Sequence, residues 1–147
     1  LNTTDAGAGE HRGGYGIILG HEALNDDMTF SGTYGRFEYP AWGFNGGKQG
    51  APSGFDFLLK DGTHVPLQGT GSKIQMHKGD VARMVTGTGG GYGSPLARPA
   101  EKVAMDVKNE YVSIDAAEKI YGVLLEPETF AILGVTDERK KFSEKAS

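Results

Sequence analysis

The uneven distribution of glycine is the feature that most constrains this chain. The 147 residues include 24 glycines, and all but Gly122 and Gly134 lie before Pro95. Glycine has no Cβ atom, so a glycine-rich segment can turn sharply or lie directly against another backbone. Chains with many short segments and Gly/Pro-rich turns are typically rich in β-structure. We therefore expect a glycine-rich β domain over residues 1–95 and a helical C-terminal extension over residues 96–147.

Turn signals divide the first region into about six short strands. We expect these strands at residues 15–24, 28–34, 55–60, 63–67, 73–77 and 81–86. Asp61-Gly62 predicts a tight hairpin, and Lys78-Gly79-Asp80 predicts a second turn. Segments 2–14 and 40–54 are interpreted as glycine-rich loops. Short strands at this spacing favour β-sandwich or barrel-like sheet packing.

Helical signals replace the strand signals after residue 95. Pro99 suits a first helical position, with the helix reaching about Lys108. Ser113 is a candidate cap for a helix over residues 114–121, which Gly122 would end. A short β-prone segment and a charged tail, either a solvated helix or an arm on a neighbouring subunit, follow. The expected fold class is mainly β with C-terminal helices (α+β).

Composition excludes several classes of function. The net charge is −4 with mixed signs, which gives no electrostatic case for binding nucleic acid or an anionic membrane. No apolar run is long enough to span a bilayer, and no secretory signal pattern is present at the start. The chain has no cysteine, which excludes disulfides and thiolate sites. A cytoplasmic location is the default expectation. The first residue is Leu1, so both a trimmed subunit and a piece of a longer chain remain open.

Residues 87–93, Gly-Thr-Gly-Gly-Gly-Tyr-Gly, form the most conspicuous local motif. Backbone amides in such a segment can cradle phosphate. The motif lacks the Gly-Lys-Ser/Thr ending of a Walker A loop and does not fit G-x-G-x-x-G. We therefore favour the alternative, a close-packed turn that joins the sheet to the helices.

No set of titratable residues has the spacing of a catalytic or metal site. The candidates are four histidines and three glutamates: His11, His21, His64, His77, Glu10, Glu22 and Glu38. The histidines lack the short spacings of local metal ligands, and nothing selects one glutamate as a general acid. We expect no catalytic, cofactor-binding or metal-ligating residue in this chain.

Aromatic residues in the long Gly/Pro loop suggest either ligand stacking or contact with a partner. We favour partner contact, because aromatic residues carry much of the contact area of interfaces. The expected interface or pocket-lining residues are Arg36, Trp42, Phe44, Gly46, Gly47, Gly89, Gly90, Gly91 and Tyr92. The alternative is a stand-alone β-type ligand-binding module that uses Trp42, Phe44 and Tyr92.

Several motifs, in order along residues 5–123, resemble the C-terminal region of the hydantoinase B/oxoprolinase family. They are GAGEHRGGYG at 7–16, RFEYPAWGFNGG at 36–47, GAPSG at 50–54, KGDV at 78–81, TGGGYGSP at 88–95, and DV, YVS, AA and YGV between 106 and 123. Each motif is short, and their common order makes the resemblance specific. Ser94 departs from the family's usual Asp, and the chain extends beyond the usual end of the pattern.

The resemblance implies a multisubunit ATP-dependent enzyme. Larger hydantoinase A-type and B-type subunits would bind ATP, magnesium and a further divalent metal, and would act on a small ketone or a cyclic amide. Phosphorylation would activate a poorly reactive oxygen for the next step. The family's metal-binding and catalytic residues lie upstream of the region that this chain matches. This chain is therefore expected to be a non-catalytic, structural subunit that completes the B-type subunit of an acetophenone or acetone carboxylase-like complex, which joins bicarbonate to a ketone. The alternative is a subunit of a hydantoin or lactam hydrolase.

Overall fold

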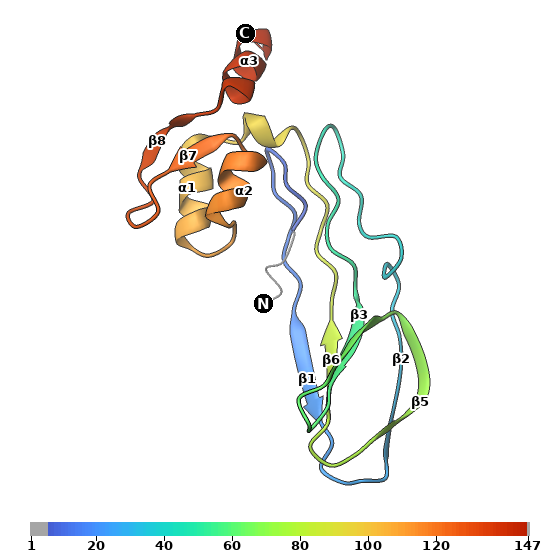
Figure 1. The fold of residues 1–147 in the computed structure, drawn as a ribbon. Helices are drawn as coiled ribbons and strands as arrows, with labels where there is room; N and C mark the ends of the chain where they lie inside the picture. The colour runs from blue at the N-terminus through green and yellow to red at the C-terminus, as the bar shows by residue number, and fades with distance from the viewer. Residues whose placement is uncertain (1–5, 147) are drawn as a thin grey trace.

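The computed structural model describes residues 6–146 and shows a molecule with two lobes (Figure 1). One lobe contains the strands β1 to β6, and the other contains the helices with the hairpin β7–β8. Long extended segments run between the two lobes and occupy much of the molecule's length. The molecule is thus elongated, with its glycine-rich segments in the middle.

A four-stranded antiparallel sheet forms the centre of the β lobe. Its strands, in spatial order, are β1 (Ile18–Glu22), β6 (Val81–Val85), β3 (Gly54–Leu58) and β4 (His64–Gln68). The turn at Asp61-Gly62 joins β3 to β4: Gly62 has φ +87°, and the Asp61 carboxylate accepts a hydrogen bond from the Thr63 amide. This confirms the hairpin that the Asp-Gly pair predicts.

A two-stranded antiparallel ribbon packs on this sheet. It consists of β2 (Met28–Thr33) and β5 (Thr70–Met76), with an irregular register between Phe30 and Gly32. The Phe30 ring meets the rings of Phe55 and Phe57 edge-on, with ring centres 5.0 and 5.5 Å apart. These rings, with Ala23, Met76 and Ala82, form the core of the β lobe. Aromatic side chains thus fill a core with few aliphatic residues.

The helical lobe has its own core. Its elements are a 3₁₀ turn η1 (Pro95–Ala97), α1 (Ala100–Lys108), α2 (Ile114–Lys119), β7 (Val123–Leu125), β8 (Ile132–Val135) and α3 (Asp137–Ala146). The buried core residues are Val103, Val107, Ala117, Tyr121, Val123 and Leu125, and Ala8 from the N-terminal segment joins them. The lobe therefore includes a residue from the glycine-rich region.

The structure confirms the expected α+β class and the six strands before residue 87. Ser113 caps α2 by accepting from the Ala116 amide, and Gly122 follows α2 with φ +66°. Pro99 lies one position earlier than expected, at the N-cap of α1. The expected loops at 2–14 and 40–54 are confirmed where the structure describes them, since they contain no helix or regular strand before β3 begins at Gly54. Residues 87–93 likewise lack regular structure and join β6 to the helical lobe, and backbone hydrogen bonds connect all three segments. Residues 2–5 lie outside the described range.

Among the described helices, none has the length and apolar content required to cross a bilayer.

Candidate partner interface

Three extended segments, residues 6–14, 41–50 and 87–94, lie side by side and form what we call the glycine layer. Backbone hydrogen bonds join them: the Gly7 amide donates to the Gly89 carbonyl (2.9 Å), and the Phe44 amide donates to the Gly91 carbonyl (2.9 Å). The Lys48 amide closes the set by donating to the Ala8 carbonyl (2.7 Å). Each segment is thus bonded to both of the others, although only isolated bridges connect them as a sheet.

Glycine is required in this layer because the backbones approach more closely than any side chain permits. A Cβ atom on Gly90 would lie 1.9 Å from the Trp42 carbonyl oxygen, and one on Gly91 would lie 2.2 Å from that of Ala8. A Cβ atom on Gly47 would lie 2.1 Å from the Gly91 oxygen. These contacts involve backbone atoms, so a side chain could be accommodated only by moving a whole segment apart.

Five of the seven backbone amides of the 87–93 motif, those of Thr88, Gly89, Gly91, Tyr92 and Gly93, already donate to carbonyls within the chain. Gly89 donates to Gly14, Gly91 to Lys48 and Gly93 to Phe44, all at 2.8–3.0 Å. A phosphate-binding loop needs such amides free to point at the anion. The motif therefore serves close packing, and it does so as an extended central segment.

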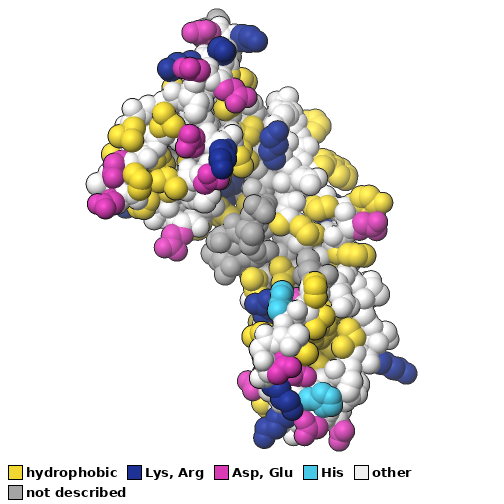
Figure 2. Space-filling view, viewed as in Figure 1, with side chains coloured by type: hydrophobic (Ala, Val, Ile, Leu, Met, Phe, Trp, Pro, Cys, Tyr) yellow, Lys and Arg dark blue, Asp and Glu magenta, His cyan; other side chains and the backbone are white. Residues whose placement is uncertain are grey.

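Large aromatic side chains project from the glycine layer into solvent. Trp42 is 74% exposed, Phe44 68% and Tyr92 49%. The rings of Phe44 and Tyr92 stack with centres 6.0 Å apart, and the Arg36 guanidinium lies 5.6 Å from the Trp42 ring centre. Hydrophobic side chains gather along this edge of the molecule (Figure 2). We call Arg36, Trp42, Phe44 and Tyr92 the aromatic face.

The predicted interface residues thus divide into two groups. Those of the aromatic face are accessible to a partner. The glycines at 47, 89, 90 and 91 face neighbouring backbone of the same chain, where they build the support for the aromatic face, while Gly46 is exposed. Contact of either group with a partner stays a prediction.

An arginine–aspartate link between the glycine layer and α1 is not evident from the sequence. Asp106 is buried on α1 and pairs with Arg98 (2.8 Å) and Arg12 (3.4 Å). The Arg12 guanidinium also lies over the rings of Tyr15 and Tyr111, at 4.4 and 5.1 Å from their centres. Burial raises the pKa of Tyr15 to about 12, so its hydroxyl stays protonated and donates to the Tyr111 carbonyl (2.7 Å). The only sequence signal for this link is that Arg12 and Asp106 lie within the family-like motifs.

A second charged network lies on the four-stranded sheet. Asp56 on β3 accepts two hydrogen bonds from the Arg83 guanidinium on β6, at 2.7 and 2.6 Å, and lies 2.8 Å from His64 Nε2 on β4. Burial by itself would raise the pKa of Asp56, but the hydrogen bonds from Arg83 and His64 outweigh it and lower the pKa. Asp56 thus stays ionised and joins three neighbouring strands.

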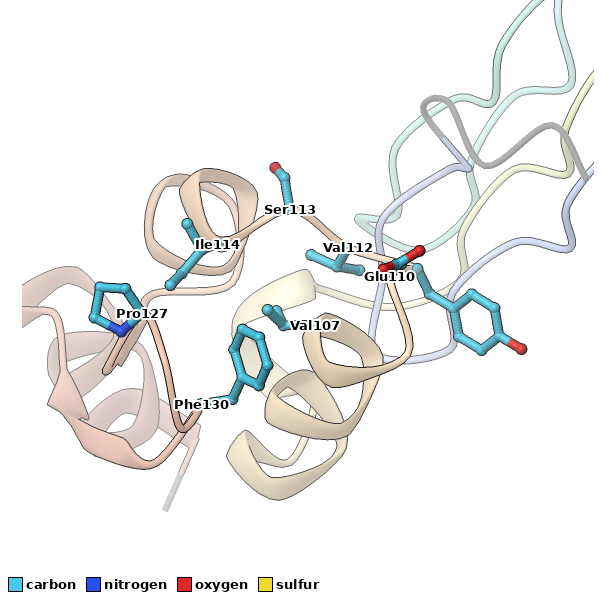
Figure 3. A pocket seen from close by; sticks show the side chains of 8 residues that line it. Val107, Glu110, Val112, Ser113, Ile114, Pro127 and Phe130 are labelled. Carbon is cyan, nitrogen blue, oxygen red and sulfur yellow. The ribbon is translucent and has the colours of Figure 1, made fainter.

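The helical lobe carries an apolar groove with a volume of about 440 Å³. Val107 comes from α1, Ile114 from α2, and Pro127 and Phe130 from the β7–β8 connection (Figure 3). Its lining is mainly apolar, with Glu110 and Ser113 at the side. Such a lining suits apolar contact better than catalysis.

The titratable residues considered from the sequence do not form a site. Glu10, Glu22 and Glu38 are exposed on three different segments. His21 is exposed on β1, and His77 lies 4.0 Å from the exposed Asp26. Within residues 6–146, no three His, Asp or Glu side chains form a group that could hold a metal ion.

Comparison with known proteins first defines the class of fold. The crystal structure of the ATP-dependent caprolactamase from Pseudomonas jessenii matches 98% of this chain with a TM-score of 0.70 and 29% identity. A nucleotide-free acetone carboxylase structure matches 97% with a TM-score of 0.68; at 22% identity, that likeness shows the fold alone. The chain therefore has a fold that occurs within large ATP-dependent enzymes.

Sequence comparison then identifies the family. The family model for hydantoinase B/oxoprolinase matches residues 1–95, and the chain belongs to that family. It is 35% identical over 136 residues to the caprolactamase subunit beta of Pseudomonas jessenii, and 38% identical over 123 residues to an uncharacterised protein of Methanocaldococcus jannaschii. These matches cover 86% and 84% of this chain but only 22% and 21% of the relatives. The chain thus spans about a fifth of the length of these relatives.

Proposed function

We propose that this chain is a structural part of the B-type subunit in an ATP-dependent complex that hydrolyses a cyclic amide. The observation that carries the proposal is the 35% identity to a caprolactamase beta subunit along 86% of the chain. The likeness to acetone carboxylase is restricted to the fold, which favours cyclic-amide hydrolysis over the ketone carboxylation that the sequence motifs suggested.

The contacts within the chain support a structural role. The buried charges are already used: Asp106 holds two arginines, and Asp56 holds Arg83 and His64. The buried Arg139 of α3 donates to the Tyr121 carbonyl (2.7 Å) and so fixes α3 to the rest of the helical lobe. The aromatic face, in contrast, is exposed, and large aromatic residues together with arginine are the types that dominate protein interfaces. We infer that this face packs against another part of the B-type subunit or against its A-type partner.

In this proposal the partner subunits bind ATP, magnesium and a further divalent metal. ATP would activate the amide by phosphoryl transfer, and magnesium would neutralise the phosphate charge. This chain would have a structural role, because its closely packed glycine layer holds the aromatic residues in a fixed arrangement for contact with a partner.

The nature of the substrate is tested with the complex purified from its source. ATP hydrolysis should rise on addition of caprolactam or hydantoin and stay at its basal rate with acetone and bicarbonate. The opposite response would favour the second candidate, a ketone carboxylase of the acetone or acetophenone type, which the shared fold supports. Turnover of either substrate by the 147-residue chain alone would contradict the structural role.

The aromatic face is tested by Trp42→Ala. The substitution should weaken assembly about tenfold or more, because a central Trp in an interface commonly contributes about 2 kcal/mol or more. It should leave the melting temperature nearly unchanged, because Trp42 is 74% exposed. Leu133→Ala is the matched control: Leu133 is 68% exposed on β8, away from the aromatic face. Equal affinity of the two variants, measured by calorimetry or quantitative pull-down, would show that the aromatic face is not the interface.

A further inference from the structure

Strand β1 lies at an edge of the four-stranded sheet and is exposed along its whole length. It flanks β6 on the side away from β3 (Figure 1). Its first residues and the one before it are apolar: Ile17 is 53% exposed, Ile18 45% and Leu19 47%. An apolar edge strand with unpaired backbone groups is a template for pairing with another strand.

The register identifies which backbone groups of β1 have no partner among residues 6–146. The Thr86 amide donates to the Ile17 carbonyl, and the Ala23 amide donates to the Asp80 carbonyl. Hydrogen bonding alternates along an antiparallel pair, so Leu19 and His21 also face β6. The amides and carbonyls of Ile18, Gly20 and Glu22 therefore point outward from the sheet.

The opposite edge of the same sheet differs. Strand β4 contains Pro66, and proline at an edge removes an amide that could bond another strand. The register between β3 and β4 is also irregular beside Pro66, and such irregularities at an edge further disfavour pairing. Strand β1 carries neither proline nor lysine. One edge is protected against pairing and the other is not.

We propose that β1 is paired, in the assembled B-type subunit, with an extended apolar segment from the part of that subunit that this chain does not contain. This inference rests on the proposed function. The length of the relatives supports this occupant, because about four-fifths of each lies outside the region that the chain matches. The added strand continues the sheet beyond β1 and covers Ile18 on one face and Leu19 on the other.

The test is hydrogen exchange at single amides, in the 147-residue chain alone and in the assembled subunit, with exchange quenched before the amides are read by NMR. Leu19 and His21 should be protected in both samples. Ile18, Gly20 and Glu22 should exchange freely in the chain alone and become protected by about tenfold or more on assembly. Docking by side chains alone does not produce this alternation.

A pair of variants at Gly20 tests the same backbone amide. Gly20→Pro removes the outward N–H and should weaken assembly by about tenfold. Gly20→Ala keeps the N–H, and its Cβ meets only Val81 Cγ1, at 3.3 Å, so it should assemble normally. Thermal unfolding shows whether the two variants are equally folded.

Each outcome bears on a different claim. If the subunit assembles while Ile18, Gly20 and Glu22 stay unprotected, the strand pairing is wrong and the proposed function stands. If the chain does not assemble with any B-type polypeptide, both are overturned. If protection arises in the chain alone and increases with its concentration, the occupant is a second copy and the proposal is refuted.

Discussion

Replacing Asp106 by asparagine should destabilise the chain strongly, because this carboxylate links the glycine layer to the helical lobe. Its side chain is only 9% exposed, and those of its partners Arg98 and Arg12 are 12% and 18% exposed. Asp106→Asn leaves two guanidinium groups in a water-poor site without a counter-charge. Breaking a buried pair in this way typically costs about 3–5 kcal/mol. Asparagine retains an oxygen that can accept a hydrogen bond from Arg98. We therefore expect the free energy of unfolding to fall by about 3 kcal/mol, the lower end of this range.

The assay is thermal and urea unfolding followed by circular dichroism. A loss of about 3 kcal/mol corresponds to a fall in melting temperature of roughly 6–12 °C for a chain of this size. Asp115→Asn is the matched control, since Asp115 pairs with Lys119 at 2.7 Å on the surface of α2, with both side chains largely exposed. That substitution should cost about 0.5 kcal/mol or less. Similar melting temperatures for the two variants would refute the view that Asp106 holds the two regions together.

Two further predictions concern the glycine layer and the four-stranded sheet. Gly91→Ala should lower the free energy of unfolding by about 3 kcal/mol, because its Cβ would lie 2.2 Å from the Ala8 oxygen. Gly14→Ala, which meets no atom within 4 Å, should change it by less than about 1 kcal/mol, and equal urea midpoints would disprove the close-packing argument. Asp56 has a lowered pKa in the folded chain, so its contribution to stability is complete above its ordinary pKa of 3.8 and is lost as the pH falls further. Asp56→Asn should therefore destabilise the chain at neutral pH and make its stability fall less steeply below pH 3.8. An unchanged dependence of stability on pH, measured by urea titration, would show that the network with Arg83 and His64 does not contribute to stability.

The sequence predicts the local elements well because their signals are local. The Asp61-Gly62 pair, the alternation after Val81 and the Ser113 cap each depend on residues a few positions apart, and each appears in the structure. The strand β7 was missed because Val123–Leu125 has only three residues, which is too short to show a period. The aromatic face was predicted as a set of interface residues, and the structure adds that its side chains are exposed while the glycines beneath them are packed.

The abundance of glycine by itself determined that many backbones in this chain could lie in direct contact, and the family-like motifs determined the family. Only the tertiary structure decided which backbones meet: residue 90 lies against residue 42, and residue 91 against residue 8. The same holds for Arg12 and Asp106, which are distant in the chain and adjacent in space. Contacts between backbones leave no pattern of side chains that would identify the partners in the sequence. Pairs that are distant in the chain form only when the whole chain folds.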